Sequence, residues 1–365
     1  MRRNYKSTLL VIALFMIVVL LFPIFSYAAN TLRVTDSSGR IVNAPAGASR
    51  IICIGSGCLR LICYLGAQDR IVGIESFEKT HQVGRSYRYA YPELLNLPII
   101  AAGGPGNINK EPDLEAVLKV KPDIIFACYM DADRADTLQK KIGMPVITLS
   151  YGRFGSFGNE LYTSLRLLGK ILDKEKRSEE IIAFTEKSKA DLLKRTSGID
   201  EASKPSVYIG GVGYRGAQGI ESTETDYLPF EWIKAKNIAK GVGREGHLFI
   251  NKEKILALNP DVIFLDALGL SIISSDYAKH PQFYQALNAF SKGQVYTLWP
   301  FNAYMTNIDT VIIDAYAAGS ILYPEKFRDI DMNKKIDEIY SFFIGKSISE
   351  QMKKDAGVLG TRWKP

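Results

Sequence analysis

Residues 115–126 read Glu-Ala-Val-Leu-Lys-Val-Lys-Pro-Asp-Ile-Ile-Phe, and residues 253–264 read Glu-Lys-Ile-Leu-Ala-Leu-Asn-Pro-Asp-Val-Ile-Phe. Six residues recur at the same steps, with a constant offset of 138 positions. Each copy predicts a short amphipathic helix, a break at Pro-Asp and a buried strand. A repeat at this distance is too long for a solenoid unit and fits two lobes of domain size. Two similar lobes in one chain predict a cleft between them in which a ligand binds.

Continuous apolar strands alternate with helical segments along the rest of the chain. Such strands are typical of a parallel sheet that is covered by helices on both faces. Between the two halves, leucines recur at helical spacing without a proline, which predicts one long helix, slightly broken near Asp173. We therefore expect an α/β protein in which two lobes, each a parallel sheet flanked by helices, are joined by one long helix. The predicted segments are an N-terminal lobe over 31–155, the connecting helix over 156–195 and a C-terminal lobe over 205–365.

The first residues have the pattern of a secretion signal. Arg2, Arg3 and Lys6 form a basic start, Leu9 to Phe22 is an unbroken apolar run, and Ser-Tyr-Ala at 26–28 offers a small-x-small cleavage site. The run of 14 residues is short for a bilayer span, so a cleaved signal over 1–28 is favoured over a retained anchor. Cleavage leaves 337 residues, enough for two domains. We expect an exported protein that is soluble after cleavage.

Charge and cysteine usage narrow the function classes. The formal charge of +7 falls to +4 without the signal, and no basic run is present, so nucleic-acid binding is not favoured. The four cysteines lack metal or redox spacing, and buried free thiols are the favoured interpretation. In an oxidising compartment, a disulfide between Cys128 and either Cys53 or Cys58 remains the alternative.

Enzyme signatures are weak in this sequence. The three histidines, at positions 81, 247 and 280, have no ligand-like spacing, so we expect no metal site made by the protein. There is no Gly-x-Ser-x-Gly elbow for a nucleophilic serine. The acidic residues form no specific catalytic pair. We therefore expect a binding protein rather than an enzyme.

The residues that follow the predicted strands are the candidates for ligand contact, because open parallel sheets bind ligands beyond the carboxyl ends of their strands. These segments are rich in aromatic residues and glycine and contain two arginines. Ring faces and guanidinium groups suit a planar or chelated, partly anionic ligand. For Trp299 and Tyr129, packing in the core is an equal alternative, and the glycines over 210–216 also fit a plain turn. The candidate ligand-binding residues are Tyr129, Tyr151, Arg153, Tyr214, Arg215, Trp299 and Phe301.

Glu115 and Glu253 open the two repeats. A carboxylate in the first turn of a helix is stabilised by the helix dipole, and this alone can account for either residue. Matching acids on two lobes, however, are complementary to a two-fold symmetric partner with paired cations. We therefore predict that both residues dock such a partner.

Several motifs of this chain are shared with one known family: Val34-Thr-Asp-Ser-Ser-Gly-Arg40, Leu97-Pro98, both Glu…Pro-Asp repeats, the central helix and Leu322-Tyr-Pro-Glu-Lys-Phe327. On these motifs the chain resembles the substrate-binding proteins of ABC importers for iron-siderophores, haem and cobalamin. The resemblance spans about residues 31–345 and implies two parallel-sheet lobes joined by one rigid helix. It also implies that Glu115 and Glu253 meet arginines of the permease dimer.

Two departures from that family refine the expectation. Many haem-binding members place a tyrosine ligand after the Leu-Pro segment, where this chain has Ile-Ile-Ala-Ala-Gly-Gly-Pro-Gly over 99–106. This argues against haem. The signal also lacks the terminal cysteine of lipid-anchored relatives, which favours a free periplasmic protein.

The resulting hypothesis is a monomeric periplasmic protein without a resident cofactor. It captures a metal chelate, most simply a ferric siderophore-type complex, and delivers it to an inner-membrane ABC permease dimer with its ATPase. Closure around the ligand is modest, because a single helical connection limits bending. Cobalamin, haem and a molybdate-type oxyanion are alternatives within the same role. An exported enzyme that uses the cleft, or a sensor or chaperone, are alternatives outside it.

Overall fold

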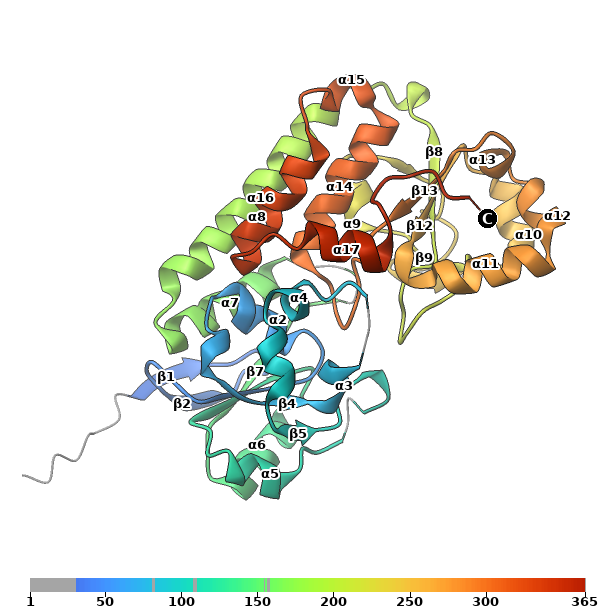
Figure 1. Ribbon diagram of the computed structural model, residues 1–365. Helices are drawn as coiled ribbons and strands as arrows, with labels where there is room; N and C mark the ends of the chain where they lie inside the picture. The colour runs from blue at the N-terminus through green and yellow to red at the C-terminus, as the bar shows by residue number, and fades with distance from the viewer. Residues whose placement is uncertain (1–30, 81–82, 108–109, 154, 156–157, 365) are drawn as a thin grey trace, which may run out of the picture. The chain divides into compact units, whose positions relative to one another are not determined.

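Two parallel sheets form the framework of the protein (Figure 1). The computed structural model describes residues 31–80, 83–107, 110–153, 155 and 158–364, and the predicted signal lies outside them. Residues 32–365 form one compact unit. Within the described part of the chain, no helix is long and apolar enough to cross a membrane. The predicted fold class, α/β with two lobes built on parallel sheets, is confirmed.

The first lobe is built on a five-stranded sheet with strand order β5-β4-β3-β6-β7, in which all neighbours are parallel. Every residue of β3 and β6 is buried, because their side chains alternate between two hydrophobic clusters on opposite faces. A short β1–β2 pair precedes it. The elements are β1 (Thr31–Thr35), β2 (Ile41–Pro45), β3 (Ile51–Ile54), α2 (Cys58–Tyr64), β4 (Ile71–Glu75), α3 (Ser76–Lys79), α4 (Ser86–Ala90), β5 (Ile99–Ala101), α5 (Leu114–Lys119), β6 (Ile124–Cys128), α6 (Ala132–Ile142) and β7 (Val146–Leu149).

The second lobe is built on a four-stranded parallel sheet with order β10-β8-β12-β13, and β9 pairs with β11 as a separate antiparallel ribbon. Helices cover the sheet on both faces, as the continuous apolar strands predict. The elements are β8 (Ser206–Gly210), β9 (Ser222–Glu224), α9 (Leu228–Trp232), β10 (Lys236–Asn237), β11 (His247–Phe249), α10 (Lys252–Leu258), β12 (Val262–Asp266), α11 (Leu270–Lys279), α12 (Pro281–Gln285), α13 (Asn288–Ser291), β13 (Val295–Leu298), α14 (Ile308–Leu322), α15 (Pro324–Phe327), α16 (Met332–Ile344) and α17 (Ser349–Ala356).

The predicted single connecting helix over 156–195 is two helices, α7 (Asn159–Leu172) and α8 (Glu175–Thr196). The break does fall at Asp173, which adopts a left-handed conformation with φ of 55°. It is a reversal rather than a slight bend, because the Tyr162 hydroxyl at the start of α7 donates to Glu186 in the middle of α8 at 2.5 Å. Leucine periodicity alone does not distinguish one long helix from two helices that fold back on each other.

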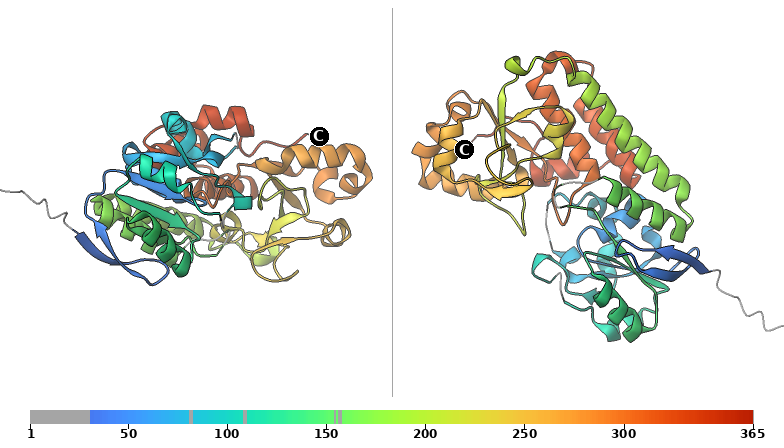
Figure 2. Two further views of the ribbon diagram at one scale, coloured as in Figure 1. Left: turned by 90° about the horizontal axis from the view of Figure 1, so that it is seen from below. Right: turned by 180° about the vertical axis from the view of Figure 1, so that it is seen from behind.

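Helix α8 makes the connection to the second lobe, where it packs along α14 (Figure 2). Tyr316 of α14 donates a hydrogen bond to Asp191 of α8 at 2.7 Å. Near the other end of α8, Arg177 donates to main-chain carbonyls at the end of α16. The helix is therefore fixed against the second lobe along its length, and α7 is the arm that reaches back to the first.

The sequence repeat is also a structural repeat. Helices α5 and α10 begin with equivalent caps, because Asp113 accepts from the backbone N–H of Ala116 at 3.1 Å and Asn251 accepts from that of Lys254 at 2.8 Å. Both helices are followed by a left-handed residue at the same step, Lys121 with φ of 46° and Asn259 with φ of 38°. These conformations are uncommon outside glycine, so the same turn is built twice.

The recurring aspartate of each Pro-Asp pair ties the repeat to the neighbouring strand. Asp123 Oδ2 accepts from the backbone N–H of Ser49 and of Arg50 at 2.9 Å each, just before β3. Asp261 Oδ2 accepts from the backbone N–H and the hydroxyl of Ser206, at 2.9 and 2.6 Å, at the start of β8. These hydrogen bonds from Ser206 lower the pKa of Asp261. The Pro-Asp pair thus fixes the start of one strand against the next.

We expect Asp123→Ala and Asp261→Ala to lower the free energy of unfolding by about 1 kcal/mol each, because each leaves strand-start N–H groups without an acceptor. The measurement is the urea midpoint at pH 7. The control is Asp200→Ala, an exposed aspartate whose side chain caps no helix. Equal midpoints for all three variants would contradict the role assigned to the repeat.

Candidate functional site

A cavity lies where the carboxyl ends of the two sheets meet. It encloses about 830 Å³ when the space open to solvent is included. Its first-lobe residues follow β3, β4, β5 and β6, and most of its second-lobe residues follow β8, β12 and β13, as expected for parallel sheets. The lining residues are Ser56, Phe77, Pro105 and Tyr129 from the first lobe, and Gly213, Tyr214, Arg215, Gly216, Leu268, Asn302, Tyr304 and Met305 from the second.

Three of the seven predicted ligand-binding residues line this cavity: Tyr129, Tyr214 and Arg215. The Tyr129 ring is 38% exposed, and its hydroxyl donates to the Met305 sulfur at 2.8 Å, across the cavity from one lobe to the other. The Tyr214 ring stacks on His247, with centroids 4.2 Å apart. The Arg215 guanidinium lies 5.6 Å from the centroid of the Tyr214 ring. Their contact with a ligand stays a prediction.

The other four predicted residues lie elsewhere. The Tyr151 side chain is fully buried and donates to the Gly57 carbonyl at 2.9 Å. Arg153 pairs with Asp226 of the second lobe and is absent from the cavity wall. Trp299 and Phe301 are in the core, where the Trp299 indole donates to the Gly357 carbonyl at 2.9 Å. Both residues follow β13, where ligand contact was predicted. The first part of the loop after this strand turns into the protein, so their side chains are buried.

Four cavity residues have strained backbones. Tyr129, Arg215, Tyr304 and Met305 have φ of 61°, 54°, 54° and 82°. They are half of the eight non-glycine residues with positive φ in the described part of the chain. Left-handed conformations of this kind cost free energy and cluster where a ligand is clamped. The strain therefore supports this cavity as the functional site.

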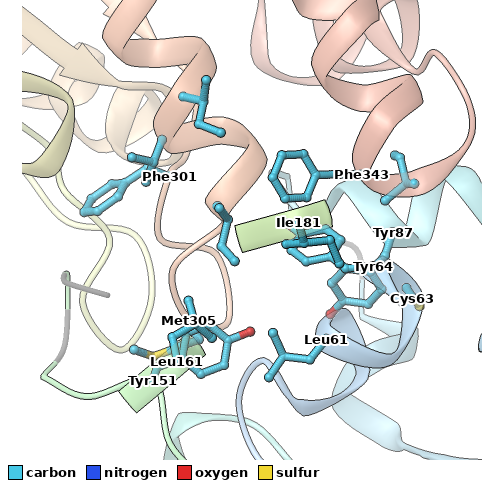
Figure 3. Packing of buried hydrophobic residues seen from close by; sticks show 14 of the residues in the cluster. Leu61, Cys63, Tyr64, Tyr87, Tyr151, Leu161, Ile181, Phe301, Met305 and Phe343 are labelled. Carbon is cyan, nitrogen blue, oxygen red and sulfur yellow. The ribbon is translucent and has the colours of Figure 1, made fainter. Parts of the chain in front are cut away.

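The loop that carries Tyr304 and Met305 is anchored in the other lobe by Arg60 of α2. Its fully buried guanidinium donates to the main-chain carbonyls of Ala303, Tyr304 and Thr306, at 2.6, 3.3 and 3.2 Å. Met305 belongs to the same hydrophobic cluster as Tyr151 of the first lobe and Leu161 of α7 (Figure 3). The sequence gives no sign of how this loop is held, because its partners lie far away along the chain, Arg60 more than 200 residues away.

A buried carboxyl stands behind the wall of the cavity. Glu75, at the end of β4, is 4% exposed. Its Oε2 accepts from the Tyr304 hydroxyl at 2.5 Å, and its Oε1 accepts from the backbone N–H of Gly55 at 2.9 Å. Burial raises the pKa of Glu75 to about 7, against the opposing effect of these two hydrogen bonds. The carboxyl therefore titrates near neutral pH.

Glu115 and Glu253 are exposed in the first turns of α5 and α10. Each helix leads through its Pro-Asp turn into the amino end of a strand, β6 or β12. Its first turn therefore points toward the carboxyl edge of the sheet, the edge on which the cavity opens. Both acids are accessible to a partner that covers this edge.

The four cysteines are buried as free thiols, in agreement with the favoured interpretation of their spacing. Cys58 donates to the main-chain carbonyl of Phe126 at 3.3 Å. Of the histidines, His81 lies outside the described residues. His247 is half-buried and hydrogen-bonded to Ser222 at 2.8 Å, so it supports the Tyr214 wall. Among the described residues, no group of three His, Cys, Asp or Glu side chains is placed to hold a metal ion.

Comparison with known proteins identifies the family. Residues 51–300 match the periplasmic binding protein family. The chain belongs to this family. The molybdate-binding protein MolA of Haemophilus influenzae is 23% identical to this binding protein over 340 residues, 87% of this chain and 92% of MolA. The Fe(3+)-citrate-binding protein YfmC of Bacillus subtilis is 24% identical over 51% of this chain and 56% of its own length.

Solved structures show the same fold. A periplasmic solute-binding protein from Veillonella parvula has a TM-score of 0.70 at 21% identity, covering 90% of this chain and 97% of its own. Molybdate-bound MolA has a TM-score of 0.69 at 19% identity, covering 87% and 98%. The relatives are substrate-binding components of ABC transporters, and this binding protein is one of that class. The predicted resemblance is confirmed.

We expect Glu75→Gln to remove a pH dependence of stability. Folding raises the pKa of Glu75 from about 4.5 to about 7. Below pH 4.5 the carboxyl is protonated in both the folded and the unfolded state and does not destabilise the fold. As the pH rises toward 7, the wild type loses free energy of unfolding. The full loss is about 3 kcal/mol. The difference in unfolding free energy between variant and wild type should therefore grow in favour of the variant from pH 5 to pH 8, measured by urea unfolding. The exposed Glu325→Gln is the control, and parallel pH profiles for wild type and Glu75→Gln would contradict the assignment.

Proposed function

We propose that this protein captures a metal chelate, most simply a ferric siderophore-type complex, and delivers it to an ABC permease. The observation that carries the proposal is the composition of the cavity wall. Among the described lining residues there is no Asp, Glu, His or Cys. These are the commonest ligands of iron, zinc and other transition metals in proteins. Tyrosine also binds ferric iron, but burial raises the pKa of Tyr129 and of Tyr304, which disfavours the phenolate that would bind it, so a bare ion would find few ligands here. A metal that binds in this cavity has to bring its own donor atoms.

The charge and the surface of the cavity fit such a complex. Among the described lining residues, Arg215 is the one with a formal charge, and its side chain is exposed. A cation in this position attracts a ligand with net negative charge. Phe77, Tyr129, Tyr214 and Tyr304 supply aromatic surface. The volume lies in the range of small-molecule sites.

A molybdate-type oxyanion is the second candidate, and the match to MolA over most of both chains favours it. A tetrahedral oxyanion needs N–H and O–H donors around its oxygens. Among the described lining side chains, such donors are carried by Arg215, Ser56 and Tyr214. The hydroxyls of Tyr129 and Tyr304 and the amide of Asn302 already donate to Met305, Glu75 and Gly213. Most of the wall would then face no ligand atom. The chelate therefore fits this wall better. Cobalamin and haem remain the other rivals within the same transport role.

The transport role includes export and docking. The basic start and apolar run at the N-terminus support secretion to the periplasm, and the protein acts there as a monomer without chemistry of its own. Glu115 and Glu253 are exposed at equivalent helix starts on the two lobes. A two-fold permease dimer with paired arginines is complementary to that arrangement.

Native mass spectrometry of protein purified from the periplasm of its own cells tests the ligand. We expect a bound species with the isotope pattern of iron. Arg215→Ala should lower its occupancy about tenfold, since a desolvated charge contact is worth roughly 1.4 kcal/mol or more. The exposed Arg328→Ala, far along the chain in the second lobe, should leave occupancy unchanged. Molybdate in place of the chelate, or equal occupancy in both variants, would overturn the proposed ligand.

Charge reversal tests the docking role. We expect Glu115→Lys combined with Glu253→Lys to abolish uptake into proteoliposomes that carry the cognate permease and ATPase, while ligand binding is retained, because lysines would face the permease arginines. The control is Glu93→Lys combined with Glu325→Lys, one exposed acid from each lobe. Full uptake by the first double variant would refute docking through these residues.

A further inference from the structure

Two aromatic rings, one from each lobe, form a clamp at the wall of the cavity. Phe77 comes from α3 of the first lobe, and Tyr304 comes from the second-lobe loop that Arg60 anchors. The ring centroids are 4.6 Å apart, with an angle of 55° between the planes. Both rings line the cavity. We call this pair the ring clamp.

The polar end of the ring clamp faces the protein. The Tyr304 hydroxyl donates to Glu75 and accepts from the backbone N–H of Gly104 at 2.9 Å. Both hydrogen-bonding directions of the phenol are therefore used behind the wall. What Tyr304 presents to the cavity is ring surface, although tyrosine is a polar residue.

The position of Phe77 is fixed just as closely. A Cβ atom at Gly104 would lie 2.8 Å from the Phe77 ring, so only glycine leaves room for the ring there. The buried Arg85 guanidinium lies 5.1 Å from the centroid of the Phe77 ring and 6.0 Å from that of Tyr304. Arg85 is held in turn by Glu78 at 2.9 Å and donates to the main-chain carbonyl of Phe77 at 3.1 Å. The ring clamp is therefore preorganised, and little conformational entropy is lost at these two rings when a ligand binds.

The other cavity residues are also held in place by contacts within the protein. The Tyr129 hydroxyl donates to the Met305 sulfur, and Tyr214 is held against His247. The cavity thus offers rings and a thioether, together with the exposed charge of Arg215. Among the described lining residues, polar side chains are too few to hold a ligand through many hydrogen bonds.

We propose that the ring clamp selects chelates whose donor oxygens are carried on aromatic rings, of the catecholate or salicylate type. This inference rests on the proposed function, that the ligand is a metal chelate. An aryl-oxygen chelate provides flat ring surface for Phe77 and Tyr304, and its negative charge is complementary to Arg215. Citrate complexes have charge without rings, and hydroxamate complexes have neither a ring nor a matching charge. Both leave the clamp without a stacking partner.

The test is a panel of probes measured by quenching of intrinsic fluorescence: the ferric complex of a linear bis(catecholamide), ferric salicylate, ferric citrate, ferric desferrioxamine B and sodium molybdate. We expect the two aryl-oxygen complexes to bind at least about tenfold more tightly than the citrate and hydroxamate complexes, the size of one good aromatic contact. If citrate or hydroxamate binds as tightly, the inference is wrong and the proposed function stands. If no ferric complex binds, or if molybdate alone binds, the inference and the proposed function are both wrong.

Variants separate the ring clamp from general stability. Phe77→Leu keeps apolar bulk and should weaken aryl-oxygen binding about tenfold, with ferric citrate unaffected. Phe283→Leu is the matched control, because Phe283 is also half-buried, has Lys252 5.3 Å from its ring centroid and lies outside the cavity. Phe77→Met, another apolar side chain without a ring, repeats the test if Phe77→Leu folds poorly. Unchanged aryl-oxygen binding in a folded Phe77→Leu or Phe77→Met variant would overturn the inference.

Discussion

The site depends on one buried cation that holds a loop of the other lobe. Arg60 of the first lobe donates to three main-chain carbonyls of the second-lobe loop that carries Tyr304 and Met305. Without Arg60, these carbonyls would lose their hydrogen-bond donor. If the lobes moved apart, the Arg60 guanidinium would lose its hydrogen-bond acceptors. The loop is therefore a fixed part of the first lobe's surface, although it belongs to the second lobe in sequence.

This anchoring determines how the cavity works. With the loop held, Tyr304 reaches Glu75 and packs on Phe77, so protein contacts alone hold a wall made from both lobes. Closure by a large hinge motion would break these contacts. The parts that remain free to adjust are the exposed ones, Arg215 on its glycine-rich turn and the ring of Tyr129. Preorganised walls lower the cost of binding, while exposed groups permit entry.

The sequence predicted the framework well because the framework is local. Apolar strands and the Pro-Asp repeat depend on neighbours within about ten residues, and both appear where expected. The reversal between α7 and α8 was missed because periodicity carries no information on the direction of successive helices. The rule that ligands lie beyond strand ends pointed to Tyr129, Tyr214 and Arg215, which line the cavity and whose contact with a ligand stays a prediction. It also pointed to Trp299 and Phe301, which the structure buries in the core, since exposure after β13 depends on a loop path that only tertiary contacts set.

The two lobes are alike in the repeated helix–turn–strand segments and differ in the residues that line the cavity. The capped helix, the left-handed residue and the strand-anchoring aspartate are equivalent in both halves, and each copy carries an exposed glutamate. The cavity walls are different, since one lobe contributes Phe77 and the other Arg215 and Tyr304. A two-fold symmetric partner needs matched contacts, whereas a ligand held between the lobes needs complementary ones. This difference between the halves agrees with the proposed roles, in which the matched acids dock the transporter and the unlike walls hold the cargo.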